Sequence, residues 1–180
     1  MINSLLIVDN VFDDPDRIIG QAKSHEYLPN QDSDLTWQGL RSKELVSYDY
    51  ETYSVIVNGM INKALEQTFG TGSNVDFKWY MNLYFHQLLA DDVMSADWFH
   101  TDNKCSYAGV VYLSKNPPKN SGTVVNTGKE ILNIENVFNR MTIYRSDFNH
   151  SAKSGFGYSI DDSRLTLTFF ITNITFSVGG

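Results

Sequence analysis

The sequence predicts a single domain of the α+β class that is mainly β, with its helices near the start of the chain. Its 180 residues are enough to bury a sizeable core. Hydrophobic residues make up 42% and aromatic residues 13%, as in folded proteins rather than disordered chains. Apolar residues follow a helical period early in the chain and alternate later. We therefore expect a helical support over 1–72 and a β core over 73–177, both within one domain that covers 1–180.

The first 72 residues are expected to hold one strand and two helices. A short apolar run predicts a strand at Leu5–Val8, and an acidic run with a proline predicts a helix over Pro15–Ser24. Residues 27–47 mix proline, glycine and charges, and we expect loop there with one short strand. A second apolar stripe at spacings of three and four predicts another helix, which Gly70 and Gly72 end. Its core-packing face consists of Tyr53, Val57, Met60, Ile61, Ala64, Leu65 and Phe69.

The pattern changes to strict alternation at Asp76, which predicts a strand with two different faces. The apolar face holds Phe77, Trp79, Met81, Leu83 and Phe85, and the polar face holds Lys78, Tyr80, Asn82, Tyr84 and His86. We expect the first face to pack on the helices and the second to line a pocket, with residues 87–97 as a loop at the rim. Further strands are predicted at Tyr107–Leu113, Thr123–Asn126, Phe138–Arg145 and Arg164–Ile171.

His100 and Asp102 are the first candidates for a metal site. On a strand, residues two apart point to the same face, so an imidazole and a carboxylate would project together. One more imidazole would give the two-histidine, one-carboxylate set with open positions that suits Fe(II). The third ligand would be His86 or His150, because His25 lies far upstream near a helix end. A sulfur-rich structural zinc site is excluded, since the chain has a single cysteine.

The last long strand begins with a candidate anion-binding residue. Alternation places Arg164, Thr166 and Thr168 on one face of this strand. A guanidinium and a hydroxyl side by side can hold a carboxylate by a charge-assisted fork and one further hydrogen bond. The start of this strand is therefore predicted to bind an anion.

These residues and their order resemble the Fe(II)- and 2-oxoglutarate-dependent oxygenase superfamily, and in particular its prolyl 4-hydroxylase-like branch. The resemblance rests on the motif His100-Thr101-Asp102, the later His150 and the still later Arg164. Residues 112–123 add a strand, a loop and a glycine turn between the motif and the distal histidine that also resemble this branch. The resemblance covers residues 77–175, and the N-terminal third lies outside it.

The resemblance implies a set of site residues. The catalytic metal ligands would be His100, Asp102 and His150. Arg164 with Thr166 would anchor the distal carboxylate of 2-oxoglutarate. A tyrosine on an inner strand often helps to hold that carboxylate in such enzymes, and Tyr84 and Tyr112 are both candidates here. The implied cofactor is Fe(II), with 2-oxoglutarate and dioxygen as cosubstrates.

The resemblance also implies a fold and an activity. The fold would be a double-stranded β-helix (a jelly roll, as in cupins), with the N-terminal helices packed on the outside of the major sheet. The activity would be hydroxylation of an unactivated C–H bond, with oxidative decarboxylation of 2-oxoglutarate to succinate. A protein side chain such as proline is the first substrate class, and a free amino acid or another small metabolite is the second.

Two alternatives to this activity stay open at the level of sequence. The first is a non-enzymatic jelly-roll binding module with a structural or spectator metal. The second is a zinc-dependent hydrolase or a cupin-type dioxygenase that uses the same three ligands without 2-oxoglutarate. The anion site predicted at Arg164 and Thr166 argues against the second alternative.

Charge and composition limit the partners and the compartment. The formal net charge of −7 disfavours nonspecific nucleic-acid binding, which needs Lys and Arg to neutralise phosphates. A single cysteine allows no internal disulfide, so we expect a reducing, cytoplasmic location. No apolar run approaches the ~18 residues of a membrane span, and the N-terminus lacks the features of a signal peptide. The oligomeric state is not predicted by any feature of the sequence.

Overall fold

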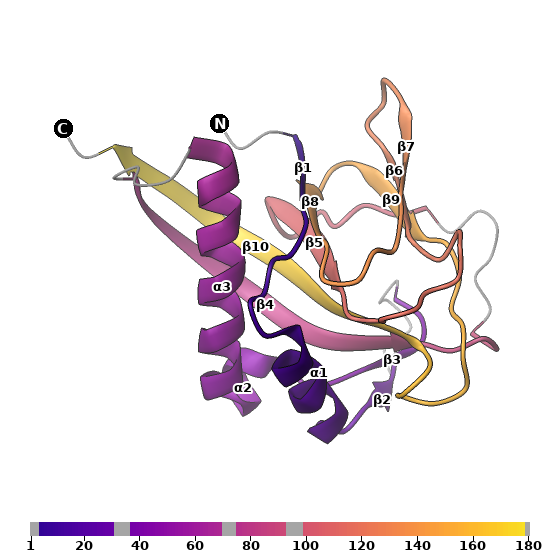
Figure 1. Cartoon of the computed structure of the whole chain (residues 1–180). Coiled ribbons are helices and arrows are strands. Elements are labelled where there is room, and N and C mark those ends of the chain that lie inside the picture. The colour runs from indigo at the N-terminus through magenta and orange to yellow at the C-terminus, as the bar shows by residue number, and fades with distance from the viewer. Residues whose placement is uncertain (1–3, 31–36, 70–74, 93–98, 179–180) are drawn as a thin grey trace.

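The computed structural model describes residues 4–30, 37–69, 75–92 and 99–178. Within these ranges, three helices and ten strands follow one another along the chain (Figure 1). The helices are α1 (Pro15–Ser24), α2 (Leu45–Tyr48) and α3 (Tyr50–Phe69). The strands are β1 (Leu5–Val8), β2 (Leu28–Pro29), β3 (Leu40–Arg41), β4 (Val75–Leu88), β5 (Tyr107–Tyr112), β6 (Thr123–Asn126), β7 (Ile131–Ile134), β8 (Met141–Arg145), β9 (Asn149–Ala152) and β10 (Arg164–Val178).

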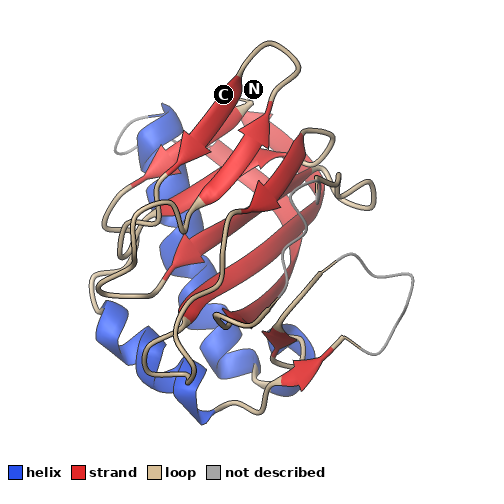
Figure 2. Cartoon of the chain, turned by 90° about the vertical axis from the view of Figure 1, so that its right-hand side faces the viewer, coloured by secondary structure: helices blue, strands red, loops and turns tan. Residues whose placement is uncertain are grey.

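The strands form two antiparallel sheets. The larger has seven strands in the order β1-β8-β5-β10-β4-β3-β2, and the smaller has three in the order β7-β6-β9. The long strands β4 and β10 lie side by side along most of their length, with Thr168 opposite Tyr84 (Figure 1). The helices lie against the outside of the strands (Figure 2). This arrangement confirms the predicted fold class, a mainly β fold with N-terminal helices on the larger sheet.

Two hydrophobic clusters lie on opposite faces of the larger sheet. The first packs the helices on the sheet and includes Ile18, Ala22, Ile56 and Met60 from helices with Leu83, Phe85, Leu167 and Phe169 from strands. The second packs the two sheets together and includes Ala108, Val110, Tyr112, Val125, Ile134 and Tyr144. Because side chains alternate along a strand, β5 supplies residues to both clusters. The larger sheet is thus the shared middle layer of the molecule.

Local sequence explains where the helices begin and how they dock. The Asp14 side chain accepts a hydrogen bond from the backbone N–H of Arg17 at 3.1 Å, and Pro15 occupies the first turn of α1. From Tyr53 to Ala64 the apolar stripe of α3 faces the sheet, and the Tyr53 hydroxyl donates to the carbonyl of Met81 at 3.0 Å. Gly70 and Gly72, which were expected to end this helix, lie outside the described residues.

Several short elements differ from what the sequence indicates. Within residues 27–47, where one short strand was expected, the chain forms β2, β3 and the single turn of α2. The strands β7 and β9 were not predicted at all, and β8 begins at Met141 rather than Phe138. Two-residue strands are too short to show a period, and β9 is built largely from polar residues. Asn139 adopts a left-handed conformation with φ of 60°, which keeps the residues before Met141 out of the strand.

Candidate functional site

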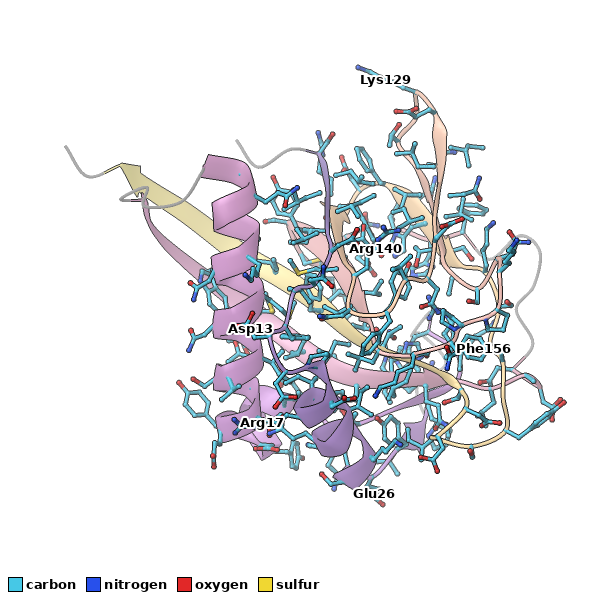
Figure 3. The ribbon with its side chains drawn as sticks, in the orientation of Figure 1. Asp13, Arg17, Glu26, Lys129, Arg140 and Phe156 are labelled. Carbon is cyan, nitrogen blue, oxygen red and sulfur yellow. The ribbon has the colours of Figure 1, made fainter. Side chains whose placement is uncertain are left out.

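A cavity of about 750 Å³ is bordered by residues of both sheets. Its walls include cavity-side residues of β4, β5 and β10 from the larger sheet and of β6 and β9 from the smaller one. The segments around β2 and β3, the chain from His100 to Cys105, and Tyr144 of β8 also line it. Lys129, in the turn between β6 and β7, lies at the tip of a loop that projects from the top of the molecule in the view of Figure 3. The volume lies within the usual range of small-molecule sites.

Three predicted metal ligands meet in this cavity. Ligand atoms of His100, Asp102 and His150 all lie within 4.8 Å of one another, and this is the group of potential metal-binding side chains found among the described residues. The Nε2 atom of His150 lies 3.1 Å from Oδ2 of Asp102, and that of His100 lies 4.0 Å from Oδ1. Two imidazoles and a carboxylate on one side of a metal are suited to Fe(II) with open positions opposite.

Backbone hydrogen bonds hold the three ligands together. The N–H of His100 donates to the carbonyl of His150 at 3.1 Å, and the N–H of His150 donates to the carbonyl of His100 at 2.9 Å. These two bonds form an isolated antiparallel bridge rather than a continuous strand. Asp102 is held by its N–H, which donates to the carbonyl of Ser146 at 2.9 Å. The strand expected around His100 and Asp102 is therefore reduced to one bridge, yet the two side chains still converge.

The tautomer of His150 is set by its other ring nitrogen. The Nδ1 atom lies 3.0 Å from the carbonyl oxygen of Phe148, so Nδ1–H is the donor there. That leaves Nε2, which faces the Asp102 carboxylate, as the ring nitrogen that can bind a metal ion. His150 is also packed against the ring of Tyr144 at 4.6 Å between centroids, which restricts its rotation.

The competing ligand His86 has a different role in the structure. Its Nε2–H donates to the carbonyl of Gln38 at 2.5 Å, and the Thr168 hydroxyl lies 3.5 Å from its Nδ1. Burial holds the pKa of His86 well below its usual value, and the nearby cations Arg41 and Arg164 lower it further. His86 is therefore neutral and hydrogen-bonded, and it is not a member of the three-ligand cluster found in the described part of the chain.

Arg164 is a buried cation at the edge of the cavity. Its side chain is 2% exposed, and its Nε–H donates to the carbonyl of Ser121 at 2.8 Å. Nη2 makes longer contacts of 3.4 Å with the carbonyl of Gly122 and the hydroxyl of Thr123. No carboxylate in the described residues forms an ion pair with it, and burial lowers its pKa. A buried charge without a counter-charge favours an anionic ligand.

The other residues predicted to hold 2-oxoglutarate lie at different places. The Tyr112 ring lies 5.7 Å from the Arg164 guanidinium, and its hydroxyl donates to Thr123 at 2.7 Å. Tyr84 borders the cavity but lies near another cation, Arg41. Thr166 is buried, and its hydroxyl lies 3.4 Å from the carbonyl of His86. Tyr112 is thus the candidate that adjoins Arg164.

Arg41 is a cavity residue that the sequence did not single out. It comes from the segment expected to be mostly loop, and it carries no motif. In the structure its guanidinium lies 4.6 Å from the Trp37 ring and 5.7 Å from the rings of Tyr84 and Phe170. The sequence does not indicate that Arg41 lies near the metal motif, because the pairing of β3 with β4 brings it to the cavity.

Comparison with known proteins identifies the fold. No family model and no curated protein matches the sequence. The structure is similar to a prolyl hydroxylase from Trichoplax adhaerens in complex with a peptide of hypoxia inducible factor, with a TM-score of 0.62 and 12% identity over 94% of this chain and 84% of that one. It is also similar to an oxidoreductase of the 2-oxoglutarate–Fe(II) oxygenase family from Burkholderia pseudomallei, with a TM-score of 0.60 and 13% identity over 94% and 84%.

A third solved structure with the same fold contains ligands. It is the epimerase SnoN in complex with Fe³⁺, α-ketoglutarate and nogalamycin RO, with a TM-score of 0.61 and 13% identity over 96% of this chain and 80% of that one. The chain therefore has the fold of the 2-oxoglutarate–Fe(II) oxygenases, prolyl hydroxylases included, and carries a His-x-Asp and distal His cluster within it. Among its described helices, none has the length and apolar character needed to cross a bilayer.

Proposed function

We propose that this protein is an Fe(II)- and 2-oxoglutarate-dependent dioxygenase that hydroxylates a C–H bond. The observation that carries the proposal is the presence, in one cavity, of the three-ligand cluster and of Arg164, a buried cation without a counter-charge among the described residues. A metal-binding module alone would not require such a cation. A hydrolase with the same ligands would not require it either.

The donor set fits the metal. Two imidazole nitrogens and one carboxylate oxygen approach one point, while the tautomer of His150 directs Nε2 toward it. Bound Fe(II) would supply dioxygen activation, coupled to oxidative decarboxylation of 2-oxoglutarate to succinate and carbon dioxide, and one oxygen atom would be transferred to the substrate. The second atom of dioxygen is accounted for in succinate.

The residues of the chain orient 2-oxoglutarate. Since the Nε–H of Arg164 already donates to Ser121, its Nη groups are those that can form a fork with the distal carboxylate. The Thr123 hydroxyl lies within reach of both Arg164 and Tyr112, and it borders the cavity. Arg164, with Thr123 and Tyr112 beside it, would fix the far end of the molecule so that its keto acid end meets the metal ligands.

Two substrate classes are compatible with this proposal. One is a protein side chain such as proline, which the relationship in fold to prolyl hydroxylases supports. The other is a small metabolite, which the similarity to the complex of SnoN with nogalamycin RO supports. We expect the enzyme to act in the cytoplasm, because its composition shows no need for an oxidising compartment.

The proposal is tested by anaerobic titration with Fe(II) and 2-oxoglutarate. An oxygenase of this kind should develop a weak visible absorption band that requires both components, and admission of dioxygen should then produce succinate. A protein that binds iron but shows neither the band nor succinate would be a binding module, and the proposal would be wrong.

A further inference from the structure

A second arginine faces the same cavity from the other side of β4. Arg41 lies on β3 directly opposite His86 of β4, and Thr166 of β10 lies opposite His86 on its other side. Arg41 and Arg164 therefore approach the cavity from opposite sides of β4, and both border it. Both also lower the pKa of His86, which lies between them. The three-ligand cluster lines the same space, and the charge of Asp102 acts on Arg41.

The contacts of Arg41 with the described residues are mainly with aromatic rings. Three aromatic rings, those of Trp37, Tyr84 and Phe170, surround its guanidinium. Its Nε atom is buried and has no hydrogen-bond partner in the part of the chain that the structure describes. Within the described residues, no carboxylate forms an ion pair with it, whereas Arg140 and Arg145 pair with Asp9 and Asp147. Aromatic faces attract a cation but accept no strong hydrogen bonds, so the donors of Arg41 are left for another group.

The neutral His86 carries no negative charge, and its ring nitrogens face other groups: Nε2–H donates to Gln38, and Nδ1 lies 3.5 Å from the Thr168 hydroxyl. The negative charge of Asp102 acts on Arg41, but the Asp102 carboxylate forms its contacts with the two histidines. A guanidinium that retains its donors in a partly dry cavity is a receptor for a planar anion, and a carboxylate matches its fork. The rings beside it offer a surface for a flat or apolar group attached to that carboxylate.

We propose that Arg41 recognises a carboxylate of the substrate, and that Trp37, Tyr84 and Phe170 pack against the adjoining part of the same molecule. The inference rests on the proposed function and narrows the substrate to a carboxylic acid, free amino acids included. Arg164 would bind the cosubstrate carboxylate and Arg41 the substrate carboxylate. The C–H bond to be hydroxylated would then lie between Arg41 and the metal ligands.

The test uses benzoate, which joins a carboxylate to a flat ring, and benzamide as its neutral analogue. The protein is loaded with Zn(II), a diamagnetic substitute for Fe(II), and saturated with 2-oxoglutarate. The chain has five arginines, so the Nε–H resonances of isotope-labelled arginine can be assigned from the spectra of Arg41→Lys and Arg164→Lys. We expect benzoate to shift the Arg41 resonance in a saturable way and benzamide to leave it unchanged.

A matched pair of variants measures the effect on affinity. Arg41→Gln should weaken benzoate binding at least about tenfold by calorimetry. Arg17→Gln removes the same charge from the exposed surface of α1 and should leave binding unchanged (Figure 3). The melting temperature of unliganded Arg41→Gln should equal or exceed that of the wild type, since a partly buried charge with no ion-pair partner among the described residues is removed. A large fall in melting temperature would show that Arg41 is structural and would overturn the proposal.

The two proposals fail in different ways. If 2-oxoglutarate shifts the Arg164 resonance but benzoate and benzamide act alike at Arg41, the carboxylate site is wrong and the oxygenase proposal stands. If benzoate shifts the Arg41 resonance but 2-oxoglutarate fails to shift that of Arg164, the oxygenase proposal fails and the carboxylate site stands.

Discussion

The two faces of the β4–β10 pair carry opposite kinds of residue in one stretch of chain. Toward the helices, Leu83 and Phe85 are completely buried in an apolar cluster. Toward the cavity, the alternate residues Tyr84 and His86 contact cations and hydrogen-bond partners. Alternation along a strand places stability on one side and chemistry on the other, so the two can be altered separately. The predictions below test that separation.

The largest effect is expected on the cavity side, from loss of a metal ligand. Asp102→Ala should abolish the absorption band with Fe(II) and 2-oxoglutarate and reduce succinate formation to background, because the only carboxylate of the cluster is removed. The free energy of unfolding without metal should change little. Asp161→Ala is the control, since Asp161 is exposed and pairs with Lys23. Turnover that persists in Asp102→Ala would remove this residue from the site.

A large effect of the opposite kind is expected on the helix side. Phe85→Ala should lower the free energy of unfolding by about 3–5 kcal/mol, measured by urea denaturation, because it leaves a cavity in the core. The folded fraction should still bind metal and 2-oxoglutarate with unchanged affinity. Tyr80→Ala alters an exposed residue of the same strand and should have a small effect. A loss of metal affinity in folded Phe85→Ala would show that the two faces are coupled.

Removal of Arg164 should act mainly on 2-oxoglutarate. Arg164→Ala is expected to raise the dissociation constant for 2-oxoglutarate by roughly 30-fold or more, since a buried charge-assisted fork contributes about 2–5 kcal/mol. Arg164→Lys keeps the charge but not the fork and should give an intermediate value. Metal affinity should be retained in both variants, as judged by equilibrium dialysis. Equal 2-oxoglutarate affinity in wild type and Arg164→Ala would assign this carboxylate to another cation.

The smallest effect concerns pH and the neutral His86. Since the pKa of His86 is well below 6.5 in the folded state, the unfolded chain binds the extra proton first as pH falls. The contribution of His86 to the free energy of unfolding is thus fully present above about pH 6.5. Below that pH it declines by up to ~1.4 kcal/mol per pH unit. His86→Gln should flatten the decline between pH 7 and 5 and retain metal. Arg41, Arg164 and Thr168 face this ring, so Thr168→Val serves as a control for local packing.

Much of the large-scale fold could be predicted because long periodic segments report their own environment. The alternation along β4 and β10 and the apolar stripe of α3 identified the central layers and the helix-covered face. The short elements escaped prediction because pairing partners, rather than local pattern, create them. For example, β3 has only two residues, and it is a strand only because it pairs with His86 and Gln87 of β4.

The residues of the candidate site also fall into those that sequence could predict and those that depend on strand pairing. His100, Asp102, His150 and Arg164 stand out because they occur in a characteristic order, and the structure brings them to one cavity. Arg41 could not be found, because its position depends on the pairing of β3 with β4 and on ring contacts between distant segments. Sequence could not separate Tyr84 from Tyr112 either, because the cation beside each ring comes from a distant segment: Arg41 beside Tyr84 and Arg164 beside Tyr112.

The isolated bridge between His100 and His150 has a consequence for local dynamics. This bridge joins the segment of His100 to β9 of the smaller sheet by two backbone hydrogen bonds. A short contact of this kind opens at low free energy, so the amide protons of both residues should exchange with deuterated solvent early. A metal ion would fasten the two segments through their side chains, and its arrival should slow that exchange at these two amides more than elsewhere.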